Sequence, residues 1–154
     1  MTPPMNPDAI DLAAPSWIPE RDLTDPKRPV ASSTAVVGGD QASGRVDFFT
    51  RWEPNSYCSF HAHLAETISV VMAGELNVEN LDGSKKRRTV GDYTCTPTGR
   101  RHYECAGPEG ALLFFSLTSK DGAAFEIIGR DGASQGVVTV ADMLAGELGL
   151  QEVG

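Results

Sequence analysis

The chain is poor in basic residues and has only three histidines. Its 154 residues carry 13 lysines and arginines against 21 aspartates and glutamates, so the formal net charge is −8 at pH 7 with the histidines neutral. A chain of this charge repels a phosphate backbone, whereas nucleic-acid binding usually needs a basic face. The one basic run, at residues 85–88, is interpreted as a charged edge strand. We therefore expect no nucleic-acid partner.

Long apolar segments are also missing. The longest apolar run covers residues 110–115, far below the ~20 residues that a membrane-spanning helix needs. A secretory signal carries basic residues ahead of a hydrophobic stretch, and residues 1–8 contain none. These patterns predict that the protein does not contact a membrane and is cytoplasmic.

Cysteine is scarce and unpatterned. Cys58, Cys95 and Cys105 are an odd number with no C-x-x-C spacing. This argues against a disulfide framework and against a zinc knuckle. We expect three reduced thiols that behave as small buried apolar side chains.

The length leaves room for one domain with a substantial core. Residues 1–29 hold most of the ten prolines and show little periodicity. They predict an extended arm that wraps on the domain or on a neighbouring subunit. Residues 30–154 form the expected domain.

The domain reads as all-β. Short segments rich in valine, threonine, phenylalanine and tyrosine are separated by turn signals, which is typical of a sandwich or barrel. Near the C-terminus, Thr139 and Asp142 form a capping pattern ahead of apolar residues at helical spacing, so one short helix is expected there. The expected strands cover residues 32–37, 45–52, 59–63, 67–73, 75–79, 86–90, 92–96, 102–105, 111–116 and 124–128.

Two of the three histidines form the triplet His61-Ala62-His63. Side chains alternate along a strand, so both imidazoles point the same way, as a metal requires of one strand. The third, His102, follows turn residues and begins another expected strand, from which it can face the same interior. This arrangement predicts a metal site.

Around these histidines the chain resembles the cupin superfamily. The second cupin motif reads G, five residues, P, one residue, G, two residues, H, and is matched by Gly91, Pro97, Gly99 and His102. The first motif reads G, five residues, H-x-H, three or four residues, E, six residues, G, and is matched by His61, His63 and Gly74. The resemblance implies a single-domain cupin, a double-stranded β-helix or jelly-roll barrel, with one divalent metal on the three histidines.

The first motif departs from the family pattern twice. Asn55 stands at the opening glycine, a turn position that asparagine fills because it tolerates left-handed backbone angles. The family's glutamate ligand falls on Thr67, and a glutamate precedes it as Glu66. A regular strand directs Thr67 inward and Glu66 outward, whereas a bulge would bring Glu66 into the site. The fourth ligand position therefore stays open between the two.

Other polar residues are candidates for roles around the metal. Tyr93 is the aromatic residue whose hydroxyl we expect to address a bound oxygen atom. Arg51, Arg101 and Glu104 are candidates for orienting substrate or ligand imidazoles. Glu66 and Tyr93 are the two candidate catalytic residues for proton transfer.

The resemblance implies a reaction as well as a metal. Three neutral imidazoles leave coordination positions open, and imidazole suits iron, nickel, copper or zinc. Cupins without the glutamate are similar to three-histidine iron dioxygenases that cleave β-diketones. The leading hypothesis is thus a non-haem Fe(II) dioxygenase, with Zn, Ni, Cu or Mn as alternative metals, that breaks a carbon–carbon bond in a small dicarbonyl or hydroxyketone substrate.

Two alternatives stay open. A metal-dependent lyase or isomerase would use the metal as a Lewis acid, with Glu66 or Tyr93 transferring a proton. A non-catalytic cupin would bind a small molecule or sense a metal. The resemblance also implies a homodimer.

Overall fold

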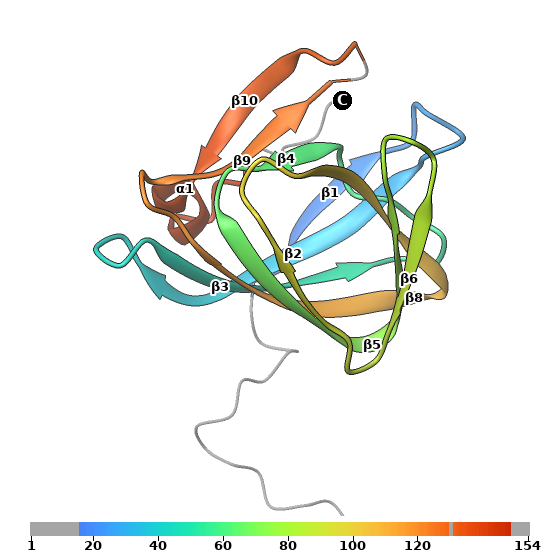
Figure 1. Cartoon of the computed structure of the whole chain (residues 1–154), viewed down its shortest axis with the longest axis horizontal. Coiled ribbons are helices and arrows are strands. Elements are labelled where there is room, and N and C mark those ends of the chain that lie inside the picture. Colours follow the sequence, from blue (N-terminus) through green and yellow to red (C-terminus); the bar gives the residue numbers. More distant parts are fainter. Residues whose placement is uncertain (1–15, 130, 149–154) are drawn as a thin grey trace, which may run out of the picture.

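The described residues fold into ten antiparallel strands and one short helix (Figure 1). The computed structural model describes residues 16–129 and 131–148, so residues 1–15 of the expected arm and 149–154 of the expected domain lie outside the described residues. In chain order the elements are β1 (Ile18–Asp22), β2 (Val30–Asp40), β3 (Arg45–Trp52), β4 (His61–His63), β5 (Glu66–Glu79), β6 (Lys85–Thr89), β7 (Tyr93–Thr96), β8 (Arg101–Thr118), β9 (Ala123–Ile128), β10 (Ser134–Thr139) and α1 (Val140–Leu144).

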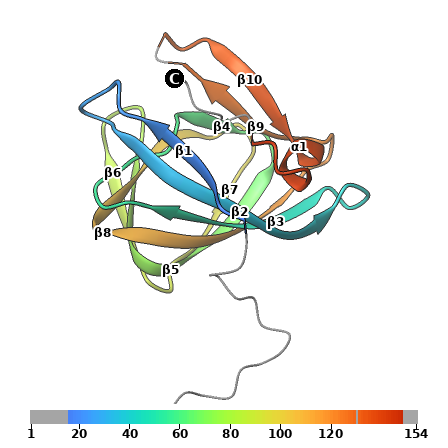
Figure 2. The same cartoon turned by 180° about the vertical axis from the view of Figure 1, so that it is seen from behind.

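The strands curl into a half-barrel, as the two opposite views show (Figures 1 and 2). One layer runs β1-β2-β3-β8-β5, and β5 also pairs with β6 and β7. The other layer runs β4-β9-β10 and joins the first where β4 pairs with the beginning of β8. The predicted all-β class is confirmed, and so is the single short helix after Thr139.

Two long strands replace four expected short ones. The segments expected at 67–73 and 75–79 are one strand, β5, and those at 102–105 and 111–116 are one strand, β8. Gly74 and Gly110 have φ angles of +72° and +80°, values that favour glycine. The expectation of separate strands was wrong because these glycines bend the paired strands without ending them.

The sequence interpretation also missed β1 and β10. Among the strands that the structure describes, β1 pairs only with β2, at the edge of its layer, and it contains Pro19. Proline is tolerated on an edge strand because its missing N–H has no ladder partner there. The described part of the arm therefore contributes a strand to the domain.

Arg28 fixes the end of the arm. Its Nη2 lies 2.6 Å from Oε1 of Glu79, and its guanidinium stacks 4.3 Å from the ring centre of Tyr103. The hydroxyl of Tyr57 donates to the other oxygen of Glu79 at 3.2 Å. These contacts hold residues between β1 and β2 against β5 and β8.

The core lies inside the half-barrel. Phe48 and Phe115 stack with ring centres 5.0 Å apart, and Leu113 and Leu117 of β8 are fully buried. α1 packs onto this core through buried Met143. The expected capping box is present, because Asp142 N–H donates to Thr139 Oγ1 and Thr139 N–H donates to Asp142 Oδ2.

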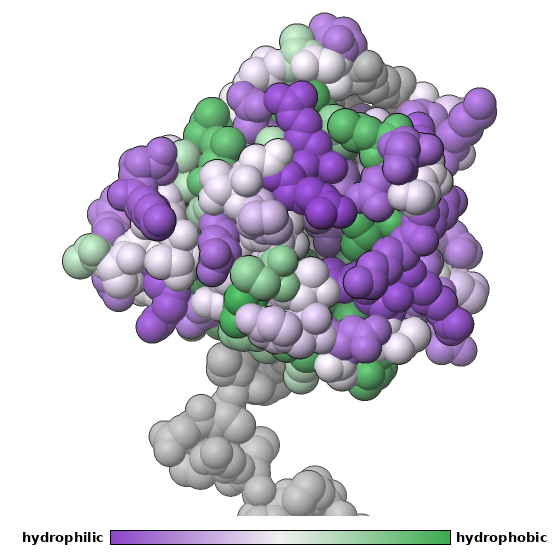
Figure 3. Space-filling view, in the orientation of Figure 1, coloured by the Kyte–Doolittle hydropathy of each residue, from purple (hydrophilic) through white to green (hydrophobic). Residues whose placement is uncertain are grey.

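On the face shown in Figure 3, hydrophilic residues gather over β6. Among the described strands β6 pairs only with β5, and it exposes Lys85, Lys86 and Arg87, as expected of a charged edge strand. Within the part of the chain that the structure describes, no helix is long and apolar enough to cross a membrane.

Candidate metal centre

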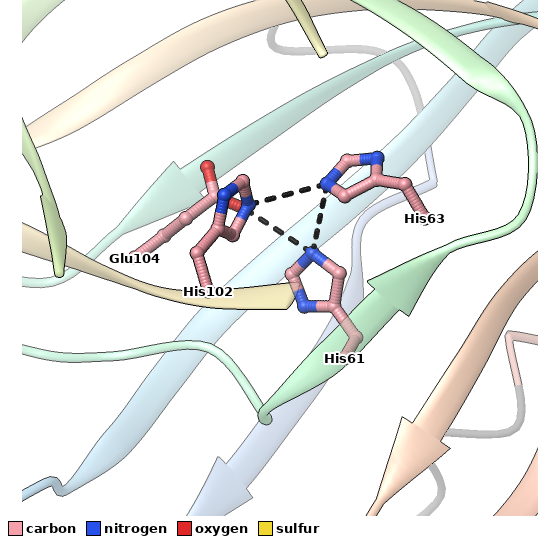
Figure 4. Close-up of side chains that lie close together, drawn as sticks. All are labelled: His61, His63, His102 and Glu104. Atoms are coloured by element: carbon pink, nitrogen blue, oxygen red, sulfur yellow. Dashed lines mark hydrogen bonds and ion pairs between the residues drawn. The ribbon is translucent and has the colours of Figure 1, made fainter. Parts of the chain in front are cut away.

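The two layers bring the three histidines together. His61 and His63 lie on β4, and His102 lies on β8 directly opposite His61 in the strand register. All three side chains are buried. Nε2 of His63 lies 3.3 Å from Nε2 of His61 and 3.2 Å from Nε2 of His102, so the three rings converge on one point (Figure 4).

Glu104 completes the group. It follows His102 by two residues on β8, so it shares the inward face of that strand. Its Oε1 lies 3.4 Å from Nε2 of His61 and 3.4 Å from Nε2 of His102. The ligand atoms of the four buried residues lie within 4.8 Å of one another, which is a group that could hold a metal ion (Figure 4).

The spacing of these atoms fits a metal. Two ligands ~2.1 Å from a metal lie ~3.0 Å apart at a right angle and ~3.4 Å apart at the tetrahedral angle. The two Nε2–Nε2 distances and the two distances from Glu104 Oε1 to Nε2 of His61 and His102 run from 3.2 to 3.4 Å. The donor set of three imidazoles and one carboxylate suits Fe, Zn, Ni, Cu or Mn.

Hydrogen bonds to the outer ring nitrogens turn the Nε2 atoms toward this point. Nδ1 of His61 donates to the carbonyl of Ser59 at 2.8 Å, and Nδ1 of His63 donates to Oγ1 of Thr67 at 3.2 Å. The Thr67 hydroxyl in turn donates to the carbonyl of Ala65 at 3.0 Å. A proton on Nδ1 leaves Nε2 free to bind a metal.

The structure therefore places neither Glu66 nor Thr67 in the fourth position. Thr67 faces inward but contacts a ring nitrogen of His63, and Glu66 is exposed because it is the next residue on a regular strand. Glu104, which the sequence indicated only as an orienting residue, lies at the ligand cluster.

Three other candidates lie away from the cluster. Tyr93 is 62% exposed, because it pairs with Val70 on the outer face of β5. Arg51 stacks on Trp17 at 4.1 Å, and Arg101 is half-exposed with a nitrogen 3.9 Å from Glu126. The structure thus does not bring Glu66 or Tyr93, the two candidate catalytic residues, into the site.

The buried charges suit metal binding. Burial would raise the pKa of Glu104, but hydrogen bonds and charges of His102 and His61 hold that pKa well below its usual range. Burial and the nearby charge of His61 lower the pKa of His63 to about 3. Burial would also lower the pKa of His61, but Cys58 and Glu104 raise that pKa above its usual range. Glu104 is therefore an anion and His63 a neutral imidazole.

The cysteines remain thiols. Within the described residues all three are free, and burial raises the pKa of Cys58 to about 11, so a ligand role is not favoured. Cys58 and Cys105 are partly buried as expected, but Cys95 is exposed because it lies on the outer face of β7.

A cavity of about 80 Å³ lies beside the cluster. His61, His63 and Glu104 form part of its wall. Most of the remaining wall is apolar, with aromatic rings from β3, β8 and β9: Phe48, Trp52, Phe115 and Phe125. A mostly apolar cavity with a few polar groups in its wall suits a small molecule.

Besides Glu79, two buried charged residues among the described ones were missed by the sequence interpretation. Glu20 of β1 is 7% exposed and lines the cavity, where it accepts the backbone N–H of Ser59, and burial raises its pKa. Arg88 is 4% exposed and donates to Oγ of Ser69 at 2.9 Å. Neighbouring residues of a strand face opposite sides, so one of Arg87 and Arg88 had to face inward, and this was a signal for the burial of Arg88. No sequence pattern indicated that Glu20 is buried.

The family follows from a match over most of the chain. Residues 26–139 match the family model of the ChrR cupin-like domain. The chain is therefore a cupin. It belongs to the ChrR cupin-like family. The sequence motifs had predicted membership of the cupin superfamily, and this prediction is confirmed.

Solved structures agree with this fold. An acetylacetone dioxygenase from Acinetobacter johnsonii is similar with a TM-score of 0.71 at 10% identity, over 96% of this chain and 95% of that chain. An RmlC-like cupin from Ralstonia eutropha JMP134 has a TM-score of 0.68 at 11% identity, over 94% and 87%. The DMSP lyase DddQ from Ruegeria pomeroyi DSS-3 has a TM-score of 0.59 at 17% identity, over 75% and 61%. No curated protein sequence matches significantly. At these identities the likeness shows the fold alone.

Proposed function

We propose that the protein is a metal-dependent enzyme whose His61, His63, His102 and Glu104 hold one divalent metal, with Fe(II) as the first candidate. The observation that carries this proposal is the convergence of three Nε2 atoms and one carboxylate oxygen at the wall of a mostly apolar cavity. A bound metal would supply Lewis acidity toward a carbonyl oxygen and, as Fe(II), chemistry with dioxygen.

The proposed reaction is oxygen-dependent cleavage of a carbon–carbon bond in a small dicarbonyl or hydroxyketone. The mostly apolar wall of the cavity, with its aromatic rings, fits a small organic substrate of this class. Similarity to acetylacetone dioxygenase supports this substrate class. Both atoms of dioxygen enter the products, which in the case of a diketone are a carboxylic acid and a ketoaldehyde.

The residues of the chain position the substrate and keep water away. Phe48, Phe115 and Phe125 pack around the cavity, and Phe125 lies edge-on to His61 and His63 with ring centres 5.5 and 5.4 Å apart. Such a dry wall strengthens electrostatic interactions inside the site. The carboxylate of Glu104 offsets part of the charge of a divalent metal, so an enolate substrate would offset the rest.

Oxygen uptake tests this function. Protein purified anaerobically and loaded with Fe(II) is mixed with 1,3-diketones and aromatic hydroxyketones in an oxygen electrode. We expect substrate-dependent uptake that His61→Ala and Glu104→Gln abolish and that Glu66→Gln leaves unchanged. If the metal-loaded protein consumes no oxygen with any of these compounds, the dioxygenase proposal fails.

A metal-dependent lyase is the second candidate. Similarity to a DMSP lyase and the buried carboxyl of Glu20 in the cavity favour it, because a lyase needs a proton-transfer group beside its metal. The two candidates differ in their need for oxygen. Product formation under strict anaerobiosis identifies a lyase or isomerase, and metal binding without turnover identifies a binding or sensing protein.

A further inference from the structure

The cavity holds a second carboxylate that the metal group does not use. Among the described residues that line it, the acidic ones are Glu20 and Glu104. Glu104 is directed at two imidazoles, at 3.4 Å from each. Glu20 therefore remains as the carboxylate that faces a molecule in the cavity.

Glu20 is held in place from two sides. In β1 it pairs with Ser32 of β2, and Ser32 also lines the cavity. Its Oε1 accepts the backbone N–H of Ser59, and the carbonyl of Ser59 accepts Nδ1–H of His61. One residue thus links Glu20 to a metal ligand, which fixes the carboxylate beside the metal group.

We propose that Glu20 is a catalytic residue that removes a proton from the carbon between the two carbonyl groups of a dicarbonyl substrate. This inference rests on the function proposed above. The C–H bond breaks, its electron pair becomes part of the enolate, and the proton goes to the Glu20 carboxylate. Nothing is oxidised in this step, and the proton leaves to the product carboxylate or to water at the end of the turnover.

The surroundings suit a base. Glu20 is 7% exposed, and the wall of the cavity beside it is mostly apolar, so the carboxylate is largely shielded from solvent. A buried carboxyl group also binds a proton more strongly than an exposed one, which makes it a better base near neutral pH.

Glu20→Gln separates catalysis from a structural role. The glutamine oxygen still accepts the N–H of Ser59, but the amide cannot take a proton. Glu53→Gln is the matched control, because Glu53 is exposed and does not line this cavity. Metal content and thermal unfolding are measured for both variants, and we expect both to match the wild type.

The test follows enolate formation by ultraviolet absorbance in the Zn(II)-loaded protein without oxygen. Acetylacetone must be deprotonated in the site, whereas trifluoroacetylacetone at slightly alkaline pH is already ionised. General-base catalysis typically contributes ~10²–10⁴-fold. We expect Glu20→Gln to slow enolate formation from acetylacetone by about that factor and to leave binding of the fluorinated diketone unchanged.

Two outcomes overturn the proposal. Equal slowing with both diketones would make Glu20 a structural residue, and no slowing with either would give it no role in proton transfer. If the wild type binds Zn(II) but neither forms an enolate from acetylacetone nor binds the fluorinated diketone, the proposed substrate class fails, and the role of Glu20 fails with it.

Discussion

Glu104 gives the histidine cluster its negative charge. The residue is 4% exposed, and its Oε1 lies 3.4 Å from two imidazole nitrogens. A buried carboxylate without partners is costly, so Glu104 gains most from a cation at the cluster. The spacing of two residues after His102 places it there.

Glu104→Gln tests the ligand directly. Loss of the anionic ligand is expected to weaken Zn(II) binding by at least ~100-fold. Substituting a residue that only hydrogen-bonds a ligand already lowers metal affinity by ~10–100-fold, and a ligand itself should matter more. Glu66→Gln is the control, since Glu66 is exposed at the start of β5. Competition with a chelator measures both dissociation constants, and equal values for the two variants would remove Glu104 from the ligand set.

Thr67 is predicted to act through His63. Thr67→Val removes the oxygen that accepts Nδ1–H of His63 at 3.2 Å, so the ring loses its fixed orientation. We expect metal affinity to fall ~10–100-fold, with Thr67→Ser retaining most of it because serine keeps the hydroxyl. The same competition assay measures this, and a valine variant with wild-type affinity would show that the bond has no effect on the metal.

The bend of β5 and β8 depends on a close approach of two backbones. A Cβ on Gly74 would lie 2.1 Å from the carbonyl oxygen of Gly110, and the φ angle of Gly74 is +72°. Gly83 also has a positive φ, +85°, but nothing lies within 4 Å of a Cβ there. Alanine at Gly83 therefore tests backbone strain alone, whereas alanine at Gly74 tests backbone strain together with a steric clash.

Gly83→Ala is expected to cost about 1–2 kcal/mol for the left-handed backbone alone. Gly74→Ala should cost about 1–3 kcal/mol more, because two paired strands must move apart. Urea unfolding measures both free energies. If Gly74→Ala lowers the free energy of unfolding by no more than Gly83→Ala does, the bend of β5 and β8 tolerates a side chain at Gly74.

The attachment of the arm should depend on pH. Arg28 lowers the pKa of Glu79 against the effect of burial, which would raise it. A lowered carboxyl pKa means that the ion pair stabilises the fold at pH values above the ordinary carboxyl pKa of 4.5, and that this stability is lost as pH falls through the lower folded-state pKa.

Arg28→Met is therefore expected to cost about 1 kcal/mol at neutral pH. The difference from wild type should shrink at acid pH as Glu79 becomes protonated. Urea unfolding at several pH values measures the difference in free energy of unfolding between the wild type and Arg28→Met. A difference that stays constant with pH would assign the effect of Arg28 to its contact with Tyr103.

The elements differ in how far the sequence predicted them. β3 was predicted with its observed bounds, because its residues alternate clearly between faces. Asn55 has a φ of +58°, which confirms the expected left-handed turn at the motif's first position. β1 escaped prediction because prolines hide its alternation, and Glu20 escaped with it. Glu104 was predicted as a residue that orients the substrate or the ligand imidazoles. Its place at the ligand cluster follows only from distances in the folded structure, which the sequence does not contain.

At the level of the whole molecule, the metal would tie the two layers together. His61 and His63 come from the three-residue β4, whereas His102 and Glu104 come from β8, which belongs to both layers. A ligand that binds only the folded state stabilises it by ~4.1 kcal/mol at 1,000 times its dissociation constant. The homodimer and the cytoplasmic location stay predictions, and light scattering of purified protein measures the first.

The central claim is that the three histidines and Glu104 hold one divalent metal. Native mass spectrometry of protein loaded with Fe(II) or Zn(II) under anaerobic conditions tests it most directly. We expect one metal ion per chain in the wild type and in Glu66→Gln, and none in His61→Ala or His102→Ala. A wild-type chain that binds no metal under any loading, or histidine variants that keep the metal, would rule out this metal site.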